Sequence, residues 1–232
     1  MRSFFCVALL LSSLAAAQTK NPRSCRILYL GAPDGAPETL ELFDGAASRP
    51  VELARMNFSP VYRLPAGPLV LRLLPAPPAK PAEVNPDAPK IAVPEGVDNF
   101  YLLVSTDTAN QVAPVKMQVI DANPENFRKG QMLWFNLTAN SIGGQVGGLQ
   151  LAMPANSRKI LDAPAAANED FNVNLSYRMP GNERLYPLCE TKWLHDTRAR
   201  TVYFVLTQEG NRTPRVMGFP DYRESAETAA KP

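Results

Sequence analysis

The chain has 232 residues, 45% of them hydrophobic, which is enough for one large β domain or for two domains of about 100 residues each. Its 24 basic and 22 acidic residues give a formal net charge of +2, and no block of like charges interrupts the sequence. Nucleic-acid binders normally carry a basic stripe, so the composition argues against a nucleic-acid partner. The 23 prolines fall between hydrophobic runs, which predicts many short strands and rigid turns and argues against helices.

Residues 1–17 have the pattern of a secretory signal peptide. Arg2 supplies the positive start, residues 4–11 form an apolar run, and the alanines at 15–17 precede Gln18 as a cleavage site. The apolar run is too short to span a bilayer, and no other segment reaches about 18 apolar residues. We therefore expect an exported protein, periplasmic or extracellular, with no transmembrane segment in the mature chain.

Two cysteines, Cys25 and Cys189, remain once residues 1–17 are removed. In an oxidising compartment an even pair suggests one disulfide, which would close a long loop and could stabilise the fold by up to about 5 kcal/mol. The alternative is two buried, unlinked thiols. The pair lacks the C-x-x-C spacing of a redox site.

Short strands separated by turn residues fill the first half of the chain. They are predicted at 26–31, 39–43, 51–54, 61–64, 69–74, 90–93, 100–105 and 112–121. The polar, proline-bearing segment 121–126 then follows and is the candidate domain boundary. We expect a first β-sandwich domain over residues 25–121.

One part of this half resembles a known family. The run GAPDGAPETLELFDG (31–45), followed by VYRLPAGPLVLR (61–72), is similar to a bacterial exported β-sandwich module of unknown function. Members of that family show a Ser-Pro-Asp-Ala-Pro-like loop, an alternating strand ending in Asp-Gly, and a later Leu-Pro-Ala-Gly turn. The resemblance covers residues 27–74 and implies an immunoglobulin-like or transthyretin-like sandwich on the cell exterior. The chain departs from the pattern where Gly31 and Ala32 stand in place of the usual serine.

The most biased segment is 75–96, which contains seven prolines. A polyproline ligand for an aromatic groove is one interpretation. The other, which we favour, is a stiff surface excursion between two strands.

A second β-sandwich domain is predicted over residues 127–221. Its strands are expected at 132–138, 149–153, 158–161, 171–177 and 217–219, and the two glycine pairs at 143–144 and 147–148 suit a hairpin or a bulged strand pair. Residues 222–232 are polar and rich in alanine, so we expect a disordered tail. No strict repeat is found, although the similar length and strand count of the halves fit two related sandwiches.

The residues from 184 to 207 read as a hairpin of two long strands. The alternation is clearest after the turn, where Val202, Phe204 and Leu206 share one face and Tyr203 and Val205 the other. Such a hairpin needs a second sheet to cover its large side chains. The fold class is therefore all-β, with two immunoglobulin-like antiparallel β-sandwich domains or one extended sandwich.

Catalytic motifs are scarce. His195, the only histidine, precedes Asp196, but adjacent residues of a strand point to opposite faces, so we interpret it as a surface turn residue and not as part of a triad. No G-x-S-x-G elbow, phosphate loop or calcium loop is present. We expect no catalytic residue, no cofactor and no metal site.

Aromatic residues offer a candidate ligand face, formed by Trp193, Tyr203 and Trp134. Core packing is the alternative role for such rings in a sandwich. The sequence thus predicts a non-catalytic envelope protein that acts in adhesion, scaffolding or assembly through a protein partner. A glycan- or peptide-binding module is the alternative, and an unrecognised hydrolase is a weaker one.

Overall fold

The computed structural model describes residues 22–207 and 213–223. The predicted signal peptide and residues 224–232 of the predicted tail lie outside these ranges. Within them the chain consists of strands and turns, with one short 3-10 turn at Pro81–Glu83. The all-β prediction is confirmed. No helix in the described ranges has the length and apolarity needed to cross a bilayer.

The strands form four sheets of four strands each. Outer sheet 1 has the order β3-β2-β5-β6, with bounds Ser48–Glu52, Thr39–Phe43, Leu69–Leu74 and Lys90–Val93. Inner sheet 1 has the order β4-β1-β7-β8, with bounds Tyr62–Leu64, Arg23–Tyr29, Asn99–Thr106 and Val115–Asp121. Inner sheet 2 has the order β12-β9-β15-β16, with bounds Ser157–Leu161, Met132–Asn136, Arg200–Leu206 and Arg215–Asp221. Outer sheet 2 has the order β11-β10-β13-β14, with bounds Leu149–Met153, Ser141–Val146, Asp170–Arg178 and Tyr186–Leu194.

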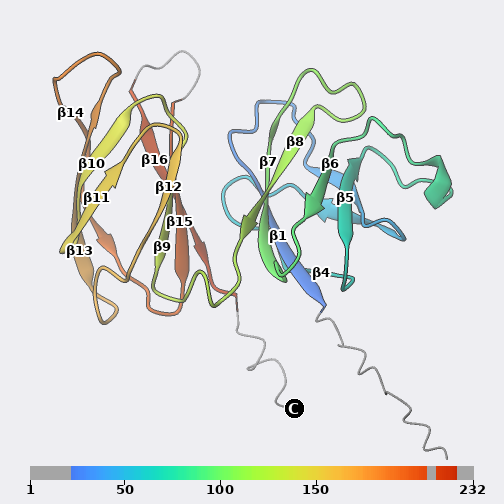
Figure 1. Cartoon of the computed structure of the whole chain (residues 1–232), viewed down its shortest axis with the longest axis horizontal. Helices are drawn as coiled ribbons and strands as arrows, with labels where there is room; N and C mark the ends of the chain where they lie inside the picture. The colour runs from blue at the N-terminus through green and yellow to red at the C-terminus, as the bar shows by residue number, and fades with distance from the viewer. Residues whose placement is uncertain (1–21, 208–212, 224–232) are drawn as a thin grey trace, which may run out of the picture.

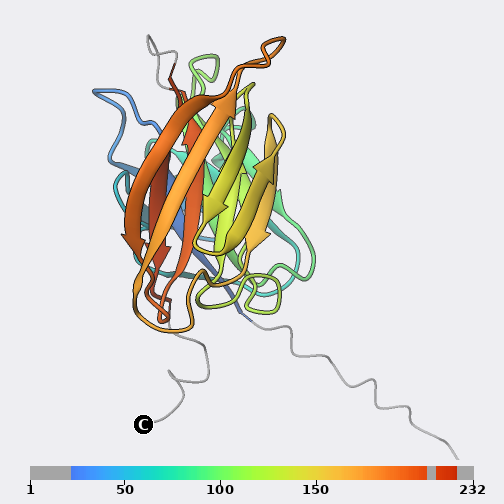
Figure 2. The same cartoon turned by 90° about the vertical axis from the view of Figure 1, so that its left-hand side faces the viewer.

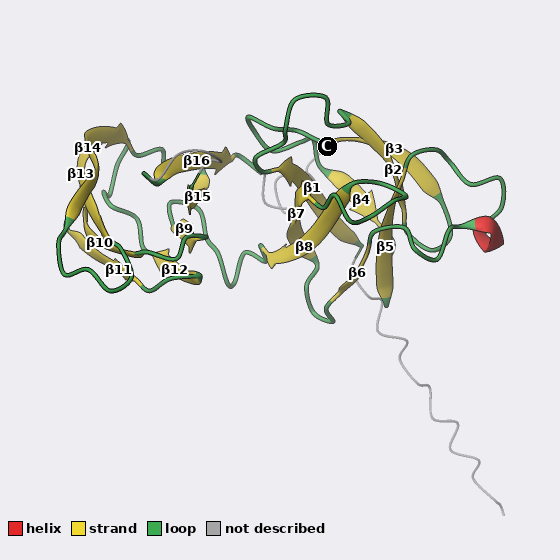
Figure 3. Cartoon of the chain, turned by 90° about the horizontal axis from the view of Figure 1, so that it is seen from above, coloured by secondary structure: helices red, strands yellow, loops and turns green. Residues whose placement is uncertain are grey.

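These sheets stack as four layers, in the order in which they are described above (Figures 1 and 3), and Figure 2 shows outer sheet 2 facing the viewer. Each half of the chain is a sandwich of one outer and one inner sheet, and each sandwich encloses its own hydrophobic core. A third core lies between the two inner sheets and joins the halves. Its aromatic side chains are those of Phe58, Tyr101, Phe127, Phe135, Phe204 and Phe219.

The two halves have the same topology, strand for strand. Strands β1 to β8 correspond in order to β9 to β16, and each inner sheet contains one parallel pair, β1 with β7 and β9 with β15. All the other pairings are antiparallel. The similar strand count of the two halves predicted two related sandwiches, and the structure has the same eight-strand arrangement in each half.

Burial differs between inner and outer sheets. Strand β13 of outer sheet 2 alternates between buried and exposed residues, whereas all five residues of β9 in inner sheet 2 are buried. A strand with a core on each face has no polar side, and its sequence is a continuous apolar run. The two patterns are present in the sequence and distinguish the outer strand β13 from the central inner strand β9.

The proline-rich segment packs against the first sandwich. Ala88 and Val84 contact Phe43 and Leu74, and the Arg72 guanidinium donates hydrogen bonds to backbone carbonyls within the segment. These contacts support a stiff surface excursion.

The predicted hairpin at 184–207 is wrong in its pairing. Its strands exist as β14 and β15, but β14 pairs with β13 in the outer sheet, while β15 pairs with β9 and β16 in the inner sheet. The turn at 195–199 therefore crosses between layers. The alternation of β15 reflects two cores, since Val202 and Phe204 enter the core between the halves and Tyr203 and Val205 enter that of the second sandwich.

The predicted disulfide between Cys25 and Cys189 is also wrong, because both thiols are free. Cys25 lies on β1 in the core of the first sandwich, and Cys189 lies on β14 in outer sheet 2. Inner sheet 2 separates them, and stacked sheets lie about 10 Å apart, well beyond disulfide reach. Burial raises the pKa of Cys25 to about 12, which keeps the thiol protonated and unreactive.

A buried ionic cluster ties the C-terminal end of β16 to both halves. The fully buried Asp221 carboxylate accepts hydrogen bonds from Arg26 of β1, Arg200 of β15 and the Tyr101 hydroxyl of β7, the last at 2.6 Å. Arg223 adds an ion pair at 3.6 Å, and its side chain is only 9% exposed. The predicted tail from residue 222 is thus packed at least as far as Arg223.

Burial by itself would raise the pKa of Asp221, but the charge of Arg223, the Tyr101 hydrogen bond, Arg200 and Arg26 outweigh it, and the pKa is lowered. A carboxyl whose pKa is lower in the folded state contributes stability that is complete above its usual value of 3.8. That stability is lost as the pH falls through the lower, folded-state pKa.

The Asp221→Asn variant should therefore be less stable by about 3–5 kcal/mol at neutral pH, because it leaves buried arginine charges without their counter-ion. Urea unfolding followed by circular dichroism measures the difference. It should shrink below pH 3.8, where the carboxyl protonates in the unfolded wild-type chain, and the wild-type advantage should be lost once the pH has fallen through the lower, folded-state pKa. The control is Asp98→Asn, whose partly exposed side chain lies 3.9 Å from Arg23, and its cost should stay under about 1 kcal/mol. Equal costs for the two variants would contradict this role for Asp221.

Candidate binding cleft

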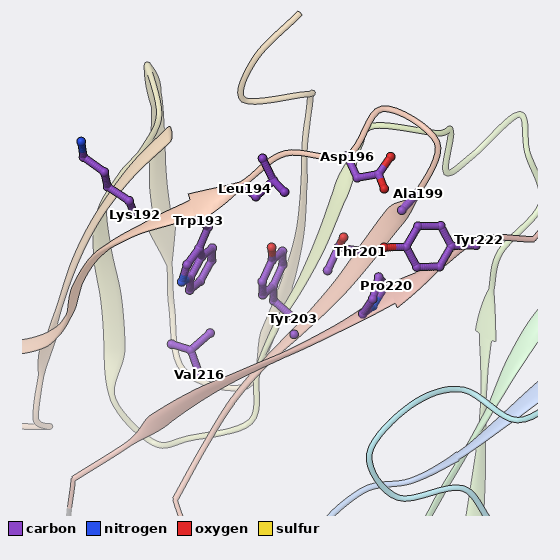
Figure 4. Close-up of a pocket in the computed structure, with 11 residues that line it drawn as sticks. Lys192, Trp193, Leu194, Asp196, Ala199, Thr201, Tyr203, Val216, Pro220 and Tyr222 are labelled. Atoms are coloured by element: carbon purple, nitrogen blue, oxygen red, sulfur yellow. The ribbon is translucent and has the colours of Figure 1, made fainter. Parts of the chain in front are cut away.

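The second sandwich is open along the side where the edge strands β14 and β16 face each other. A cleft of about 490 Å³ lies there, which we call the β14–β16 cleft (Figure 4). Its walls come from Trp193 and Leu194 on β14, Thr201 and Tyr203 on β15, and Val216, Gly218 and Pro220 on β16, with Asp196 and Tyr222 at one end. This volume is within the range of small-ligand sites in proteins.

Two aromatic rings form the inner wall, and a third packs behind them. The Tyr203 ring stacks on Trp134 with centroids 4.4 Å apart and on Trp193 with centroids 4.9 Å apart, and the planes of Tyr203 and Trp193 differ by only 5°. Trp134 is fully buried, whereas Trp193 and Tyr203 are half-buried and line the cleft. Two of the three predicted ligand-face residues therefore meet at one site, and the third supports them from behind.

Gly218 allows this arrangement. It pairs with Tyr203 across β15 and β16, and a Cβ at this position would lie 2.6 Å from Cε1 of the Tyr203 ring. The ring lies flat over the glycine backbone, which no other residue would permit without displacement. Burial raises the pKa of Tyr203 to about 12, while a hydrogen bond with Thr201 acts in the opposite direction. The phenol is therefore neutral at physiological pH.

Apolar side chains are exposed at the rim. Leu194 is 68% exposed and Tyr222 is 53% exposed. Figure 4 shows the Tyr222 ring across the cleft from Trp193 and Tyr203, and Lys192 pointing away from it. Sequence reasoning missed both rim residues, because a leucine at the end of a strand has no distinctive pattern and Tyr222 was assigned to the tail.

His195 and Asp196 do not form an acid–base pair. The Asp196 carboxylate instead accepts hydrogen bonds from the backbone and guanidinium of Arg198, which lower its pKa to about 2. His195 is buried, not at the surface as predicted, and its ring lies against Gly130. Among the described residues its Nε2 has no hydrogen-bond partner, and the side chain does not line the cleft.

The free backbone groups of β16 face the same opening. Residues 201, 203 and 205 of β15 bond to β9, as Thr201 N–H to Gln131 O and Leu137 N–H to Val205 O show. The alternate residues of β15 therefore bond to β16, and Val216, Gly218 and Pro220 direct their backbone groups away from the sheet. Pro220, which has no N–H, fits this outward register.

We predict that Gly218→Ala destabilises the protein by about 1–3 kcal/mol, because the new methyl group must displace the Tyr203 ring. Trp134 and Trp193 are the two tryptophans of the chain, so the emission spectrum of the folded variant should also shift. Thermal unfolding and intrinsic fluorescence measure both effects. Gly148→Ala is the matched control, since nothing lies within 4 Å of its Cβ position, and it should change stability by less than about 1 kcal/mol. An unshifted spectrum for Gly218→Ala would show that the ring stack does not depend on the glycine.

Comparison of the sequence with protein-family models and with curated proteins returned no match. The resemblance of residues 27–74 to an exported β-sandwich module therefore stays a prediction. Any functional proposal has to start from the geometry of the β14–β16 cleft.

Proposed function

We propose that the protein is a non-catalytic, exported module of the bacterial envelope that binds an extended peptide segment of a partner protein in the β14–β16 cleft. The observation that carries the proposal is the exposure of Leu194 and Tyr222 beside the half-buried rings of Trp193 and Tyr203. Large apolar side chains gathered around a hollow favour binding of an apolar ligand, because water is displaced from all of them at once.

The backbone of β16 favours a peptide as that ligand. An extended segment laid along β16 would pair with the outward groups of Val216, Gly218 and Pro220 and add a strand to inner sheet 2. Alternate side chains of the segment would enter the cleft toward Trp193 and Tyr203. Main-chain hydrogen bonds would supply affinity and the aromatic wall would select apolar side chains.

Export to the envelope is supported by the signal-peptide pattern of residues 1–17. Strand addition is a common mode of assembly and adhesion among envelope proteins. The non-catalytic part of the proposal is supported by the arrangement of His195 and Asp196, the acid–base candidates of the cleft region, because the Asp196 carboxylate bonds to Arg198 and the His195 ring lies against Gly130.

A glycan is the second candidate ligand. The nearly parallel faces of Trp193 and Tyr203 lie beside the polar groups of Thr201 and Asp196, and flat rings flanked by hydrogen-bonding groups suit a sugar. Such a ligand would use the rings but would not need the free backbone of β16.

The peptide proposal is tested with a display library of random linear peptides, from which binders are synthesised and titrated by tryptophan fluorescence. We expect selected peptides to be apolar at alternate positions and to perturb the emission of Trp193. Leu194→Asp should weaken binding at least about tenfold, since burying a leucine contributes about 1.5–3 kcal/mol. Leu185→Asp is the control, because Leu185 is 58% exposed and lies outside the cleft, and it should bind normally.

A glycan array and amide hydrogen exchange separate the candidates. Peptide binding should protect the backbone amides of Val216 and Gly218, which face solvent in the free protein. Sugar binding without that protection would replace the peptide by a glycan. Failure of both libraries to produce a ligand sensitive to Leu194→Asp would refute binding in this cleft.

A further inference from the structure

Strand β14 is an edge strand, and no other strand of the described ranges pairs with its second side. The His195 N–H donates to the Glu169 carbonyl, and Leu194 lies opposite Asp170 in the antiparallel register with β13. Hydrogen-bonded and non-bonded pairs alternate along such a ladder. The backbone groups of Glu190, Lys192 and Leu194 therefore point away from β13 to the free edge of outer sheet 2.

This edge is long compared with its counterpart in the first half. Strand β14 has nine residues, more than any other edge strand in the described ranges, whereas the corresponding β6 has four and lies between Pro89 and Pro94. Short strands and prolines are the usual protection of a sheet edge against pairing. Strand β14 is long, and its one proline, Pro187, stands near its start, so residues 188–194 lack that protection; Glu190, Thr191, Lys192 and Leu194 are all exposed.

The charges of Glu190 and Lys192 on β14 are complementary to those of a second, antiparallel β14 strand. We propose that the free edge of β14 pairs antiparallel with β14 of a second copy of this chain, about a two-fold axis at Thr191. In that register Glu190 lies opposite Lys192 of the second copy, and Lys192 lies opposite its Glu190. Moving the axis to residue 190 or to residue 192 would instead place two glutamates or two lysines opposite each other. The outward backbone groups of residues 190 and 192 form the new hydrogen bonds. The same register therefore pairs opposite charges and gives the hydrogen-bond pattern of an antiparallel strand pair.

The pairing has a consequence for the cleft. A two-fold axis between antiparallel copies of one strand stands perpendicular to the sheet, so both inner sheets lie on the same side of the joined outer sheet. The β14–β16 clefts of the two copies then face each other across the axis. The dimer does not depend on whether the cleft binds a peptide, and it can be tested without any ligand.

The test is sedimentation equilibrium of the purified chain over a range of concentrations. We expect a dimer. Its dissociation constant should rise about tenfold in the single variant Glu190→Lys and about tenfold in the single variant Lys192→Glu, because each change converts both facing pairs to like charges. The double variant Glu190→Lys/Lys192→Glu restores opposite charges and should return the constant to within about twofold of the wild-type value. Arg158→Glu, with the same charge change as Lys192→Glu on an exposed position of β12, should leave it unaltered.

A cysteine cross-link tests the register independently. Thr191 would face Thr191 of the second copy as a non-hydrogen-bonded pair, with Cα atoms about 4.5 Å apart, close enough for a disulfide. Thr191→Cys in a Cys189→Ser background should therefore form a covalent dimer on mild oxidation. A wild-type chain that stays monomeric at all concentrations, or a dimer that ignores both single charge changes, would overturn the proposal. So would a double variant as weak as the single ones, or a different protein found on this edge.

Discussion

Both inner sheets are covered on both faces, and this constraint organises the rest of the molecule. In β9, Met132 and Trp134 enter the core of the second sandwich while Leu133 and Phe135 enter the core between the halves. Strand β7 is divided in the same way between two cores. The two sandwiches are therefore joined by packing of the same kind as that within each of them. A buried position of an inner strand can hold a polar group only where a specific partner is present, as Asp221 has in its arginines and Asn136 has in the carbonyls of Asn140 and Pro154.

Asp221 also connects the candidate site to this central layer. It is the last residue of β16, which forms one wall of the β14–β16 cleft, and its partners come from inner sheets 1 and 2. The cleft wall is thus fixed at one end by charge and along its length by the contact of Gly218 with Tyr203. A site built on such an anchored strand holds its geometry before any ligand arrives, which lowers the entropy lost on binding.

Local patterns were sufficient to predict the strands but not their partners. Alternation in β13 and turn residues such as Gly147 identified elements that the structure contains. The pairing of β14 with β15 was mispredicted, because a short turn between two strands fits a hairpin and a crossing between layers equally well. The continuous apolar run of β9 did contain the missing information, since a strand with no polar side belongs in a layer with a core on each face. The prediction of a disulfide was wrong for a different reason, because the positions of two cysteines in the sequence do not show how many sheets lie between them.

The candidate site was predictable in its aromatic part only. Trp193 and Tyr203 are visible as large side chains on neighbouring strands, but the hollow beside them comes from residues that are small or rigid. In the first half, the core-facing residues of β8 are Val115, Met117 and Val119, and they pack into the core of the first sandwich. In the second half, β16 has Val216, Gly218 and Pro220 on the corresponding face, and they line the cleft. Because the two halves share one topology, the fold itself does not require a cleft at this edge. The opening is a property of the side chains of the second half, and that is why we assign binding to the second half and a supporting role to the first.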